Sequence, residues 1–369
     1  MTTVKLQNSN LSIKSCSFPI NNCSFAIMTV DAIKVNDFLS RSKNELIIDV
    51  RAPVEFFKGH LPNAINIPLF EDSERAEIGT LYKQQGKDTA VNRGLEIVSP
   101  KMTSFVNQVK ALSKNKKVFV YCFRGGMRSN SFAWLMNTSG LDAVIMKGGY
   151  KAFRNYVLDY FEQDRKIILL GGKTGSGKTD ILKKLKEQNV QIVDLENIAH
   201  HKGSAFGSIN EQKQNPQQVF EHQLYDQFSE LDHSQYVILE DESQTIGFNK
   251  IPIGLWQHMK QATIIKLEIP FELRVQKLVA DYTTVNIEAL KSCVIKIAQQ
   301  LGTLNTKLCL QYLDDRNLSD VARLSLLYYD RAYEFNYKNK KQPIININSD
   351  SIDAGINALK VKQVIDTLN

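Results

Sequence analysis

The sequence feature that most constrains the fold is a glycine-rich run at residues 172–179, Gly-Lys-Thr-Gly-Ser-Gly-Lys-Thr. It matches the pattern G-x-x-x-x-G-K-[ST], whose glycines let successive backbone N–H groups turn inward around phosphate oxygens. In such a loop the lysine reaches the outer phosphates, and the final hydroxyl can hold Mg²⁺. The run therefore predicts a site for a diphosphate or triphosphate, with these ligands: Gly172, Gly175, Ser176, Gly177, Lys178 and Thr179.

The residues on either side of this run supply the context that the motif requires. Residues 166–171 are a short apolar run, typical of a buried parallel strand. Residues 180–188 predict a helix in which Ile181, Leu182 and Leu185 share one face and lysines occupy the other. A strand, a loop and a helix in this order aim a helix N-terminus at an anion. A glycine-rich turn without a ligand is the alternative interpretation, which this context disfavours.

Composition limits the class of protein. At 369 residues, with 43% hydrophobic and 23% charged residues, the chain suits two globular domains. No apolar run is long enough to span a bilayer, so we expect no membrane partner. Residues 1–27 are polar and lack the features of a secretion signal, which predicts a flexible N-terminal extension. The net charge of +7 favours an anionic partner such as RNA, with a merely basic surface as the alternative.

The cysteines show no pattern of a disulfide framework or a zinc site. Their number is odd, and no CxxC or Cys/His cluster occurs. This usage predicts a reduced, cytoplasmic protein. The five positions are Cys16, Cys23, Cys122, Cys293 and Cys309.

The most notable cysteine opens a second loop. Residues 117–121 predict a strand, and Cys122 follows it, ahead of two glycines, Arg124 and Arg128, and a helix that begins near Ser129. A cysteine at a strand end that faces inward amides and a helix N-terminus lies in positive potential, which favours its thiolate. That environment suits a nucleophile that carries sulfur or selenium as a persulfide-type anion. A small buried cysteine without a catalytic role is the alternative.

The first part of the chain resembles a rhodanese domain over about residues 28–160. Residues 44–50 and 64–68 predict further strands, and residues 53–57 a short helix that starts with proline. Rhodaneses carry sulfur on the loop cysteine, so the resemblance implies that Cys122 is the carrier. The segments that carry the resemblance are 49–51, 59–60, 63–68, the Cys122 loop and 147–150.

The second part of the chain predicts a P-loop domain of the NTPase or kinase type, residues 161–369, with a helical C-terminal region. Its strands and helices alternate, which indicates a parallel sheet. The overall prediction is an α/β protein with a rhodanese-like domain followed by this parallel-sheet domain. Besides the strand before the glycine run, the expected strands are 190–194, 235–239, 262–269 and 343–347, and the expected helices are 216–231 and those between 287 and 337.

Acidic residues follow two of these strands: Asp194 and Glu196 after one, and Glu240, Asp241 and Glu242 after the next. Ligands of parallel sheets lie at the carboxyl ends of strands, and a carboxylate there commonly holds Mg²⁺. We therefore expect Thr179, Asp241 and Glu240 as the candidate metal ligands, with solvated carboxylates as the alternative.

Three further cations are candidates for substrate contacts. His201 and Lys202 lie in a glycine-containing segment between the acidic groups, and Arg274 follows the predicted strand at 262–269. Each could contact an anionic substrate. For His201 and Lys202 the alternative is a surface loop, and for Arg274 it is a helix-surface arginine.

The combination of the two domains resembles the tRNA 2-selenouridine synthase family from about Met28 to the C-terminal region. Three positions depart from the family pattern: Gln244 and Lys202 replace arginines, and Arg331 replaces a proline. Lys202 keeps a positive charge without the bidentate fork of arginine. The segments that carry the resemblance are the Cys122 loop, 78–82, 171–179, 195–207, 240–247 and 327–333.

The resemblance implies replacement of the sulfur of 2-thiouridine at the tRNA wobble position by selenium. Geranyl diphosphate first alkylates the sulfur, giving S-geranyl-2-thiouridine, and selenophosphate then supplies selenium. Lys178 and Cys122 would be the catalytic residues of the two steps. The implied partners are tRNA, bound through basic surface such as Lys183, Lys184, Lys186 and Lys338–Lys341, and selenophosphate synthetase as donor. Mg²⁺ is the one metal expected, and no tightly bound cofactor is.

Two other functions fit the motifs. The first is an ATP-dependent small-molecule kinase fused to a sulfurtransferase, which would turn over ATP without tRNA. The second is a non-catalytic nucleotide switch whose first domain docks a partner. Binding of geranyl diphosphate would oppose the first, and a requirement for Cys122 in selenium transfer would oppose the second.

Overall fold

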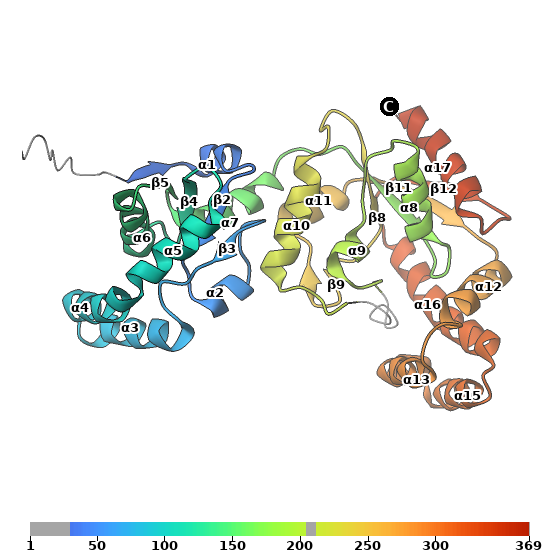
Figure 1. Ribbon diagram of the computed structural model, residues 1–369. Coiled ribbons are helices and arrows are strands. Elements are labelled where there is room, and N and C mark those ends of the chain that lie inside the picture. Colours follow the sequence, from blue (N-terminus) through green and yellow to red (C-terminus); the bar gives the residue numbers. More distant parts are fainter. Residues whose placement is uncertain (1–29, 204–211, 369) are drawn as a thin grey trace, which may run out of the picture.

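Two five-stranded parallel sheets organise residues 30–203 and 212–368, the part of the chain that the computed structural model describes (Figure 1). The predicted extension at 1–27, with Cys16 and Cys23, lies outside the described residues. Among the described helices, none combines the length and apolar character that crossing a bilayer requires. The predicted α/β class with two successive domains is confirmed.

The first sheet has the order β1-β5-β4-β2-β3, and all its neighbouring strands are parallel. Its strands are β1 (Asp31–Ile33), β2 (Leu46–Asp49), β3 (Ile65–Asn66), β4 (Lys117–Tyr121) and β5 (Asp142–Met146). The helices around it are α1 (Val35–Arg41), α2 (Pro53–Phe57), α3 (Asp72–Gln84), α4 (Lys87–Val98), α5 (Met102–Leu112), α6 (Met127–Thr138) and α7 (Gly149–Tyr160), with a short 3₁₀ turn at Ser99–Lys101.

The second sheet has the order β12-β11-β6-β8-β7, again with parallel neighbours, so β6 lies at its centre. Its strands are β6 (Ile167–Gly172), β7 (Ile192–Val193), β8 (Val237–Glu240), β11 (Thr263–Glu268) and β12 (Ile344–Asn348), beside a small antiparallel pair, β9 (Thr245–Ile246) and β10 (Asn249–Lys250). The helices are α8 (Lys178–Glu187), α9 (Leu195–Ala199), α10 (Gln217–Ser229), α11 (Ile253–Met259), α12 (Phe271–Tyr282), α13 (Ile287–Lys296), α14 (Ala298–Leu301), α15 (Thr303–Asp314), α16 (Leu318–Lys338) and α17 (Ala354–Leu368).

Most predicted elements are present within a few residues of their expected bounds. The strand at Lys117–Tyr121 and the helix at Pro53–Phe57 match the prediction residue for residue. Four strands were not predicted from the sequence: β1, β5, β9 and β10. Short apolar runs such as β5 cannot be separated from a buried helix by periodicity alone, and two-residue strands carry almost no periodic signal.

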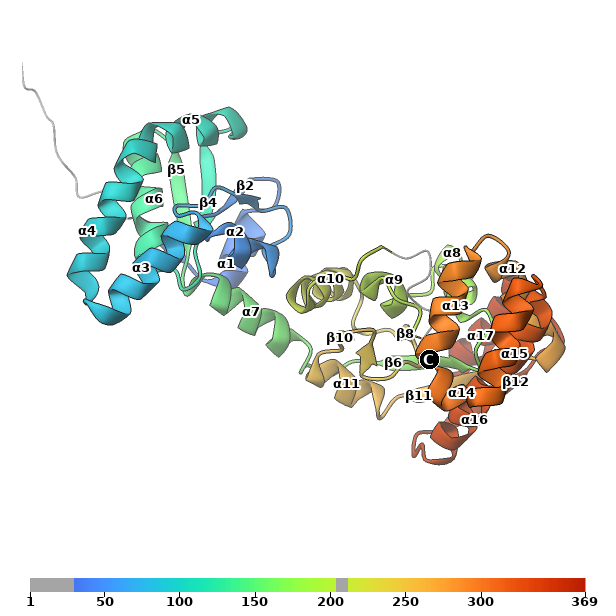
Figure 2. The same ribbon diagram turned by 90° about the horizontal axis from the view of Figure 1, so that it is seen from below.

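The two domains share one apolar core, to which the helices α7 and α10 contribute. Figure 2 shows where these two helices meet between the two sheets. Phe153 and Val157 of the first domain belong to the same buried cluster as Phe220, Leu224 and Phe228 of the second. Burial of this much aromatic surface stabilises the packing of one domain on the other.

Polar contacts flank this core. The Tyr150 hydroxyl donates to Gln218 Oε1 at 2.8 Å, and Arg154 forms an ion pair with Glu221. His222 Nδ1 lies 2.9 Å from the carbonyl oxygen of His60, to which it donates. Burial, followed by the charge of Arg154, lowers the pKa of His222 to about 3, so this bond is made by a neutral ring. The contacts fix the register between α7 and α10.

Phe220→Ala is expected to lower the free energy of unfolding by about 3–5 kcal/mol, because it opens a cavity in the shared core. The side chain is fully buried. Phe57→Ala is the matched control, since Phe57 is 78% exposed and its loss should change stability by less than about 0.5 kcal/mol. Urea denaturation of both variants measures the difference. Equal stabilities would contradict the shared core.

Candidate active sites

The glycine run forms a loop at the carboxyl end of β6, directly before α8. Gly175 and Gly177 have φ angles of 80° and 77°, a region that glycine enters without strain. Gly177 is the N-cap of α8, so the helix N-terminus points at the loop. A side-chain carbon built at Gly177 would meet no described atom within 4 Å, which leaves this side of the loop open. The geometry suits a bound anion.

A backbone carbonyl group of the loop holds the Lys178 side chain in place. Its Nζ donates to the carbonyl oxygen of Gly172 at 3.1 Å and lies 5.9 Å from the centre of the Tyr333 ring. Burial alone would lower the pKa of Lys178, but the neighbouring Tyr333 and buried carboxyl groups outweigh it and raise the pKa. Lys178 is therefore a permanent cation at the site.

Two buried polar atoms at the loop lack a hydrogen-bond partner among the described residues. They are Ser176 Oγ and Glu240 Oε1, and both side chains are at most 1% exposed. Burial of an unsatisfied polar atom costs about 1–3 kcal/mol. Ser176 was predicted to contact phosphate, and its unpaired hydroxyl is available for such a ligand.

Buried carboxyl groups surround Thr179. The Thr179 hydroxyl donates to Glu196 Oε2 at 3.1 Å, and Glu240 Oε2 accepts from the backbone N–H of Leu195 at 2.9 Å. Burial, and then the charge of Glu196, raises the pKa of Glu242 to about 8. Burial also raises the pKa of Glu196, which accepts a hydrogen bond from Glu242. At neutral pH Glu242 holds the proton of this pair.

The proton held by Glu242 should make the free energy of unfolding depend on pH. Between pH 4.5, the ordinary pKa of a glutamic acid, and about 8, folded Glu242 keeps a proton that the unfolded chain loses. The unfolded state then binds fewer protons, so the free energy of unfolding falls as the pH rises through this window. Glu242→Gln is expected to flatten that fall, as measured by urea denaturation between pH 5 and 8. The exposed Glu187→Gln should retain the wild-type slope, and an unchanged slope in Glu242→Gln would rule the assignment out.

The expected metal ligands are only partly together. Asp241 is bonded to Lys340 and to the Tyr337 hydroxyl, the latter at 2.9 Å, whereas Thr179 is bonded to Glu196. Within the described part of the chain, no three His, Cys, Asp or Glu side chains are grouped to hold a metal ion. Thr179 and Glu196 do supply hard oxygen atoms beside the loop. They fit Mg²⁺, which binds one or two protein oxygens together with substrate phosphates.

Arg274 lies behind the glycine loop. It is 3% exposed, and its guanidinium forms a bidentate pair with Asp330 at 2.8 and 2.7 Å. It also donates to the carbonyl oxygens of Thr174 and Ile269, both at 3.2 Å. Arg274 therefore ties the loop to α16 instead of lying on a helix surface, and its predicted contact with a phosphate stays a prediction.

His201 and Lys202 follow α9 at the last residues described before 204–211. The backbone N–H of His201 donates to the carbonyl oxygen of Glu196 at 3.0 Å, which joins this segment to the carboxyl cluster. The Lys202 side chain is exposed. Their substrate contacts stay predictions. Of the departures from the family pattern, Arg331 is exposed on α16, and the Gln244 carbonyl oxygen accepts from the backbone N–H of Ile251.

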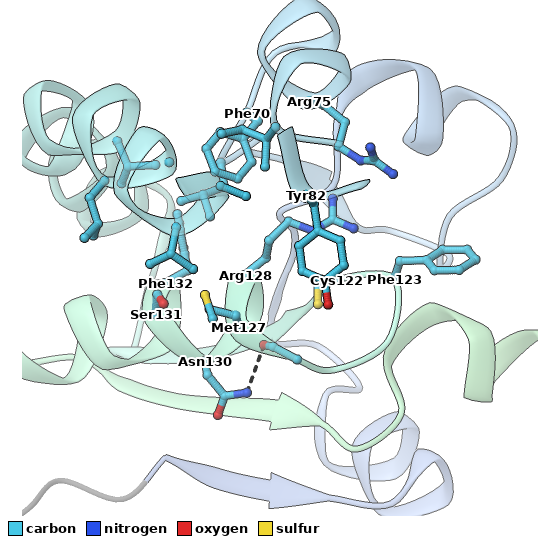
Figure 3. A pocket seen from close by; sticks show the side chains of 18 of the residues that line it. Phe70, Arg75, Tyr82, Cys122, Phe123, Met127, Arg128, Asn130, Ser131 and Phe132 are labelled. Atoms are coloured by element: carbon cyan, nitrogen blue, oxygen red, sulfur yellow. Dashed lines mark hydrogen bonds between the residues drawn. The ribbon is translucent and has the colours of Figure 1, made fainter. Parts of the chain in front are cut away.

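Cys122 stands where β4 meets the loop that leads to α6 (Figure 3). Its side chain is 3% exposed, and it lines a cavity of about 1310 Å³. The backbone of Gly149 approaches so closely that a side-chain carbon there would lie 2.3 Å from the Cys122 carbonyl oxygen. The thiol is thus fixed at the wall of a cavity.

The Ser129 hydroxyl can form a hydrogen bond with the Cys122 sulfur whether that sulfur is a thiol or a thiolate. The two side chains are 3.2 Å apart, Sγ to Oγ, and the Ser129 hydroxyl lies 3.1 Å from the carbonyl oxygen of Gly126. While that hydroxyl donates to Gly126, the thiol proton can be donated to Ser129. After the thiol loses its proton, the hydroxyl can rotate and donate to the sulfur. The N-terminus of α6 adds positive potential at the same place.

The two arginines of this loop have different surroundings. Arg124 is exposed, whereas Arg128 Nη1 donates to Glu55 Oε2 at 2.8 Å. Arg75 lies 3.6 Å from the same carboxylate. Glu55 partly neutralises Arg128, which the sequence did not reveal. Both predicted arginines nevertheless line the cavity beside Cys122.

No functional role was predicted from the sequence for Tyr333 or Tyr337. Both lie on α16, one close to Lys178 and the other donating to Asp241. The distance along the chain from residue 178 to residue 333 hides such contacts. The resemblance did include residues 327–333, and this was the one signal that could have pointed to Tyr333.

Comparisons with known proteins cover both domains. Residues 34–156 match the family model for a rhodanese-like domain, and residues 165–362 match the model for the tRNA 2-selenouridine synthase AAA domain. A tRNA 2-selenouridine synthase from Shewanella denitrificans is 35% identical over 81% of this chain and 90% of its own length. One from Sulfurovum sp. is 35% identical over 84% of this chain and 94% of its own length.

Proposed function

The chain belongs to the tRNA 2-selenouridine synthase family, and we propose that it is a tRNA-modifying transferase that replaces the sulfur of wobble 2-thiouridine with selenium through an S-geranyl intermediate. The observation that carries the proposal is the presence in one chain of two separate loops, each followed by a helix N-terminus, whose geometry suits an anion. One loop holds Lys178 as a fixed cation, and the other holds the Cys122 thiol at a cavity wall.

In the first step, the loop around Lys178 would bind geranyl diphosphate. The sulfur of 2-thiouridine attacks the first prenyl carbon, a carbon–sulfur bond forms, and the carbon–oxygen bond to the diphosphate breaks. The diphosphate leaves with the electron pair, and the base loses its N3 proton. Lys178 and the amides at the start of α8 would stabilise the leaving anion. Mg²⁺ bound at Thr179 and Glu196 would neutralise further phosphate charge.

In the second step, selenium from selenophosphate would reach the base from the Cys122 loop. Selenium bonds to C2, the bond from C2 to sulfur breaks, and the geranyl thiol leaves with the electron pair and a proton. Water then attacks the phosphorus, the selenium–phosphorus bond breaks to give inorganic phosphate, and its electron pair stays on the selenium at C2. S-alkylation matters because a thiol leaves far more readily than the sulfur of a neutral thiocarbonyl. Cys122 would position the anionic selenium donor near the N-terminus of α6, with no bond formed between its sulfur and the selenium.

The proposed partner is tRNA in the cytoplasm, with selenophosphate synthetase as the source of the selenium donor. Basic side chains on α8 support RNA binding, since Lys183, Lys184 and Lys186 are exposed beside the glycine loop. Lys338 and Lys341 are exposed at the end of α16, whereas Lys340 is paired with Asp241.

Mass spectrometry of tRNA nucleosides tests the proposal. Purified protein is incubated with tRNA carrying 2-thiouridine, geranyl diphosphate and selenophosphate. We expect S-geranyl-2-thiouridine with geranyl diphosphate alone and 2-selenouridine when both co-substrates are present. ATP hydrolysis without either nucleoside product would instead support the kinase alternative.

A further inference from the structure

The cavity beside Cys122 is larger than the proposed selenium transfer needs. At about 1310 Å³ it extends from the Cys122 loop between α3, α4 and α6 (Figure 3). Small-molecule sites in proteins usually measure about 300–1,000 Å³. A selenium-bearing anion would fill a small part of such a space, next to Cys122, and leave the rest without an occupant.

The walls of the cavity expose apolar side chains. Tyr82 is 60% exposed, Leu95 62%, Met127 54% and Trp134 48%, and all four line it. They come from α3, α4 and α6, and Figure 3 shows Tyr82 and Met127 on the same hollow as Cys122. A contiguous apolar surface of this kind marks a binding site, because exposure of it to water is unfavourable.

The charged side chains that line the cavity have one sign, and Glu55, which does not line it, partly offsets Arg128 and Arg75. No Asp or Glu is among the described residues that line it. The apolar walls therefore lie beside a cationic rim, which suits a ligand with an apolar part attached to anionic groups. The rim cations come from α3, α4, α6 and the Cys122 loop, and they are Arg75, Lys83, Lys87, Arg124 and Arg128.

We propose that this cavity binds the prenyl chain of the S-alkylated nucleotide while that nucleotide is part of the tRNA. The inference rests on the proposed function and adds where its intermediate is held. Free geranyl diphosphate has the same apolar and anionic chemistry. It needs one compact phosphate cradle, however, and the loop at Lys178 provides that. Cations spread over four elements suit the spaced phosphates of an RNA chain. With its chain in the cavity, the base lies next to Cys122.

Binding of two synthetic anticodon stem-loops tests the inference. One RNA carries S-geranyl-2-thiouridine, and the other is identical but carries 2-thiouridine. By fluorescence anisotropy, the full-length wild-type protein should bind the geranylated RNA at least about tenfold more tightly, because the chain leaves water. Leu95→Glu places a carboxylate in the apolar wall and should abolish this preference, with little change in affinity for the 2-thiouridine RNA.

Leu359→Glu is the matched control, since Leu359 is 56% exposed on α17 and does not line the cavity. Leu359→Glu should keep the full preference for the geranylated RNA. The two variants, Leu359→Glu and Leu95→Glu, should have the same thermal stability. Trp134→Gln, on another wall, should repeat the loss. The inference is overturned if Leu95→Glu keeps the preference, or if it weakens binding of both RNAs equally.

Two further outcomes separate the inference from the function it rests on. A wild-type protein that makes 2-selenouridine yet binds both RNAs equally would overturn the cavity assignment alone. A wild-type protein that forms no geranylated nucleoside would remove both. If Leu95→Glu lost binding of free geranyl diphosphate, measured by calorimetry, and kept its RNA preference, the cavity would belong to the diphosphate and the assignment to tRNA would be wrong.

Discussion

Lys178→Ala is expected to lower the rate of S-geranylation of 2-thiouridine by about 10²–10³-fold, because one fixed donor to the developing diphosphate anion is lost. Lys178 is well suited to this role. Its Nζ is already anchored at the Gly172 carbonyl oxygen, and its neighbours keep it charged. The measurement is single-turnover formation of S-geranyl-2-thiouridine at saturating geranyl diphosphate.

The control for this variant is Lys291→Ala. Lys291 is also a paired lysine of the second domain, but it lies on α13 and bonds to Glu288 and Asp314. It should leave the rate unchanged. Selenation of tRNA that already carries the geranyl group should survive in Lys178→Ala, since that step uses the other loop. Undiminished geranylation in Lys178→Ala would remove the glycine loop from the mechanism.

The fold was predictable where local signals were strong. The strand at Lys117–Tyr121 is apolar and β-branched, and the helix at Pro53–Phe57 begins with a residue that starts helices well. In contrast, β1 has only three residues and gains its stability by pairing with β5, more than a hundred residues later. Such pairing depends on tertiary contacts, which no local pattern contains.

The candidate site was predictable as a set of loops but not in its pairings. The strand β8 ends at Glu240, and the backbone N–H of Glu242 donates to the carbonyl oxygen of Glu240 at 2.9 Å, which makes a tight turn centred on Asp241. At this turn Asp241 meets Tyr337 and Lys340 while Glu242 meets Glu196.

Other pairings could not be read from the sequence. Asp330 binds the guanidinium group of Arg274 although the two residues are 56 positions apart in the chain, and Glu55 binds Arg128 across 73 positions. An arginine near a phosphate loop looks the same in sequence whether it faces the ligand or supports the loop from behind. Only the packing of α16 against α12 distinguishes the two for Arg274.

Cys122→Ala is expected to abolish selenation, with a loss of about 10³-fold or more, since the sulfur that positions the selenium donor is absent. Geranylation should continue, because Lys178 and its loop are untouched, so S-geranyl-2-thiouridine should accumulate in the tRNA. Liquid chromatography with mass spectrometry of the nucleosides reports both products in one sample.

The matched control is Cys293→Ala, because Cys293 is buried to the same 3% exposure but belongs to the helical cluster around α13. It tests whether loss of a buried thiol is enough to stop selenation. The two variants differ in what surrounds the sulfur. Cys122 lies 3.2 Å from Ser129, at the N-terminus of α6 and at a cavity wall. Cys293 is buried among apolar neighbours, and this burial raises the pKa of its thiol. Selenation that persists in Cys122→Ala would leave the first domain a docking module and favour the nucleotide-switch alternative.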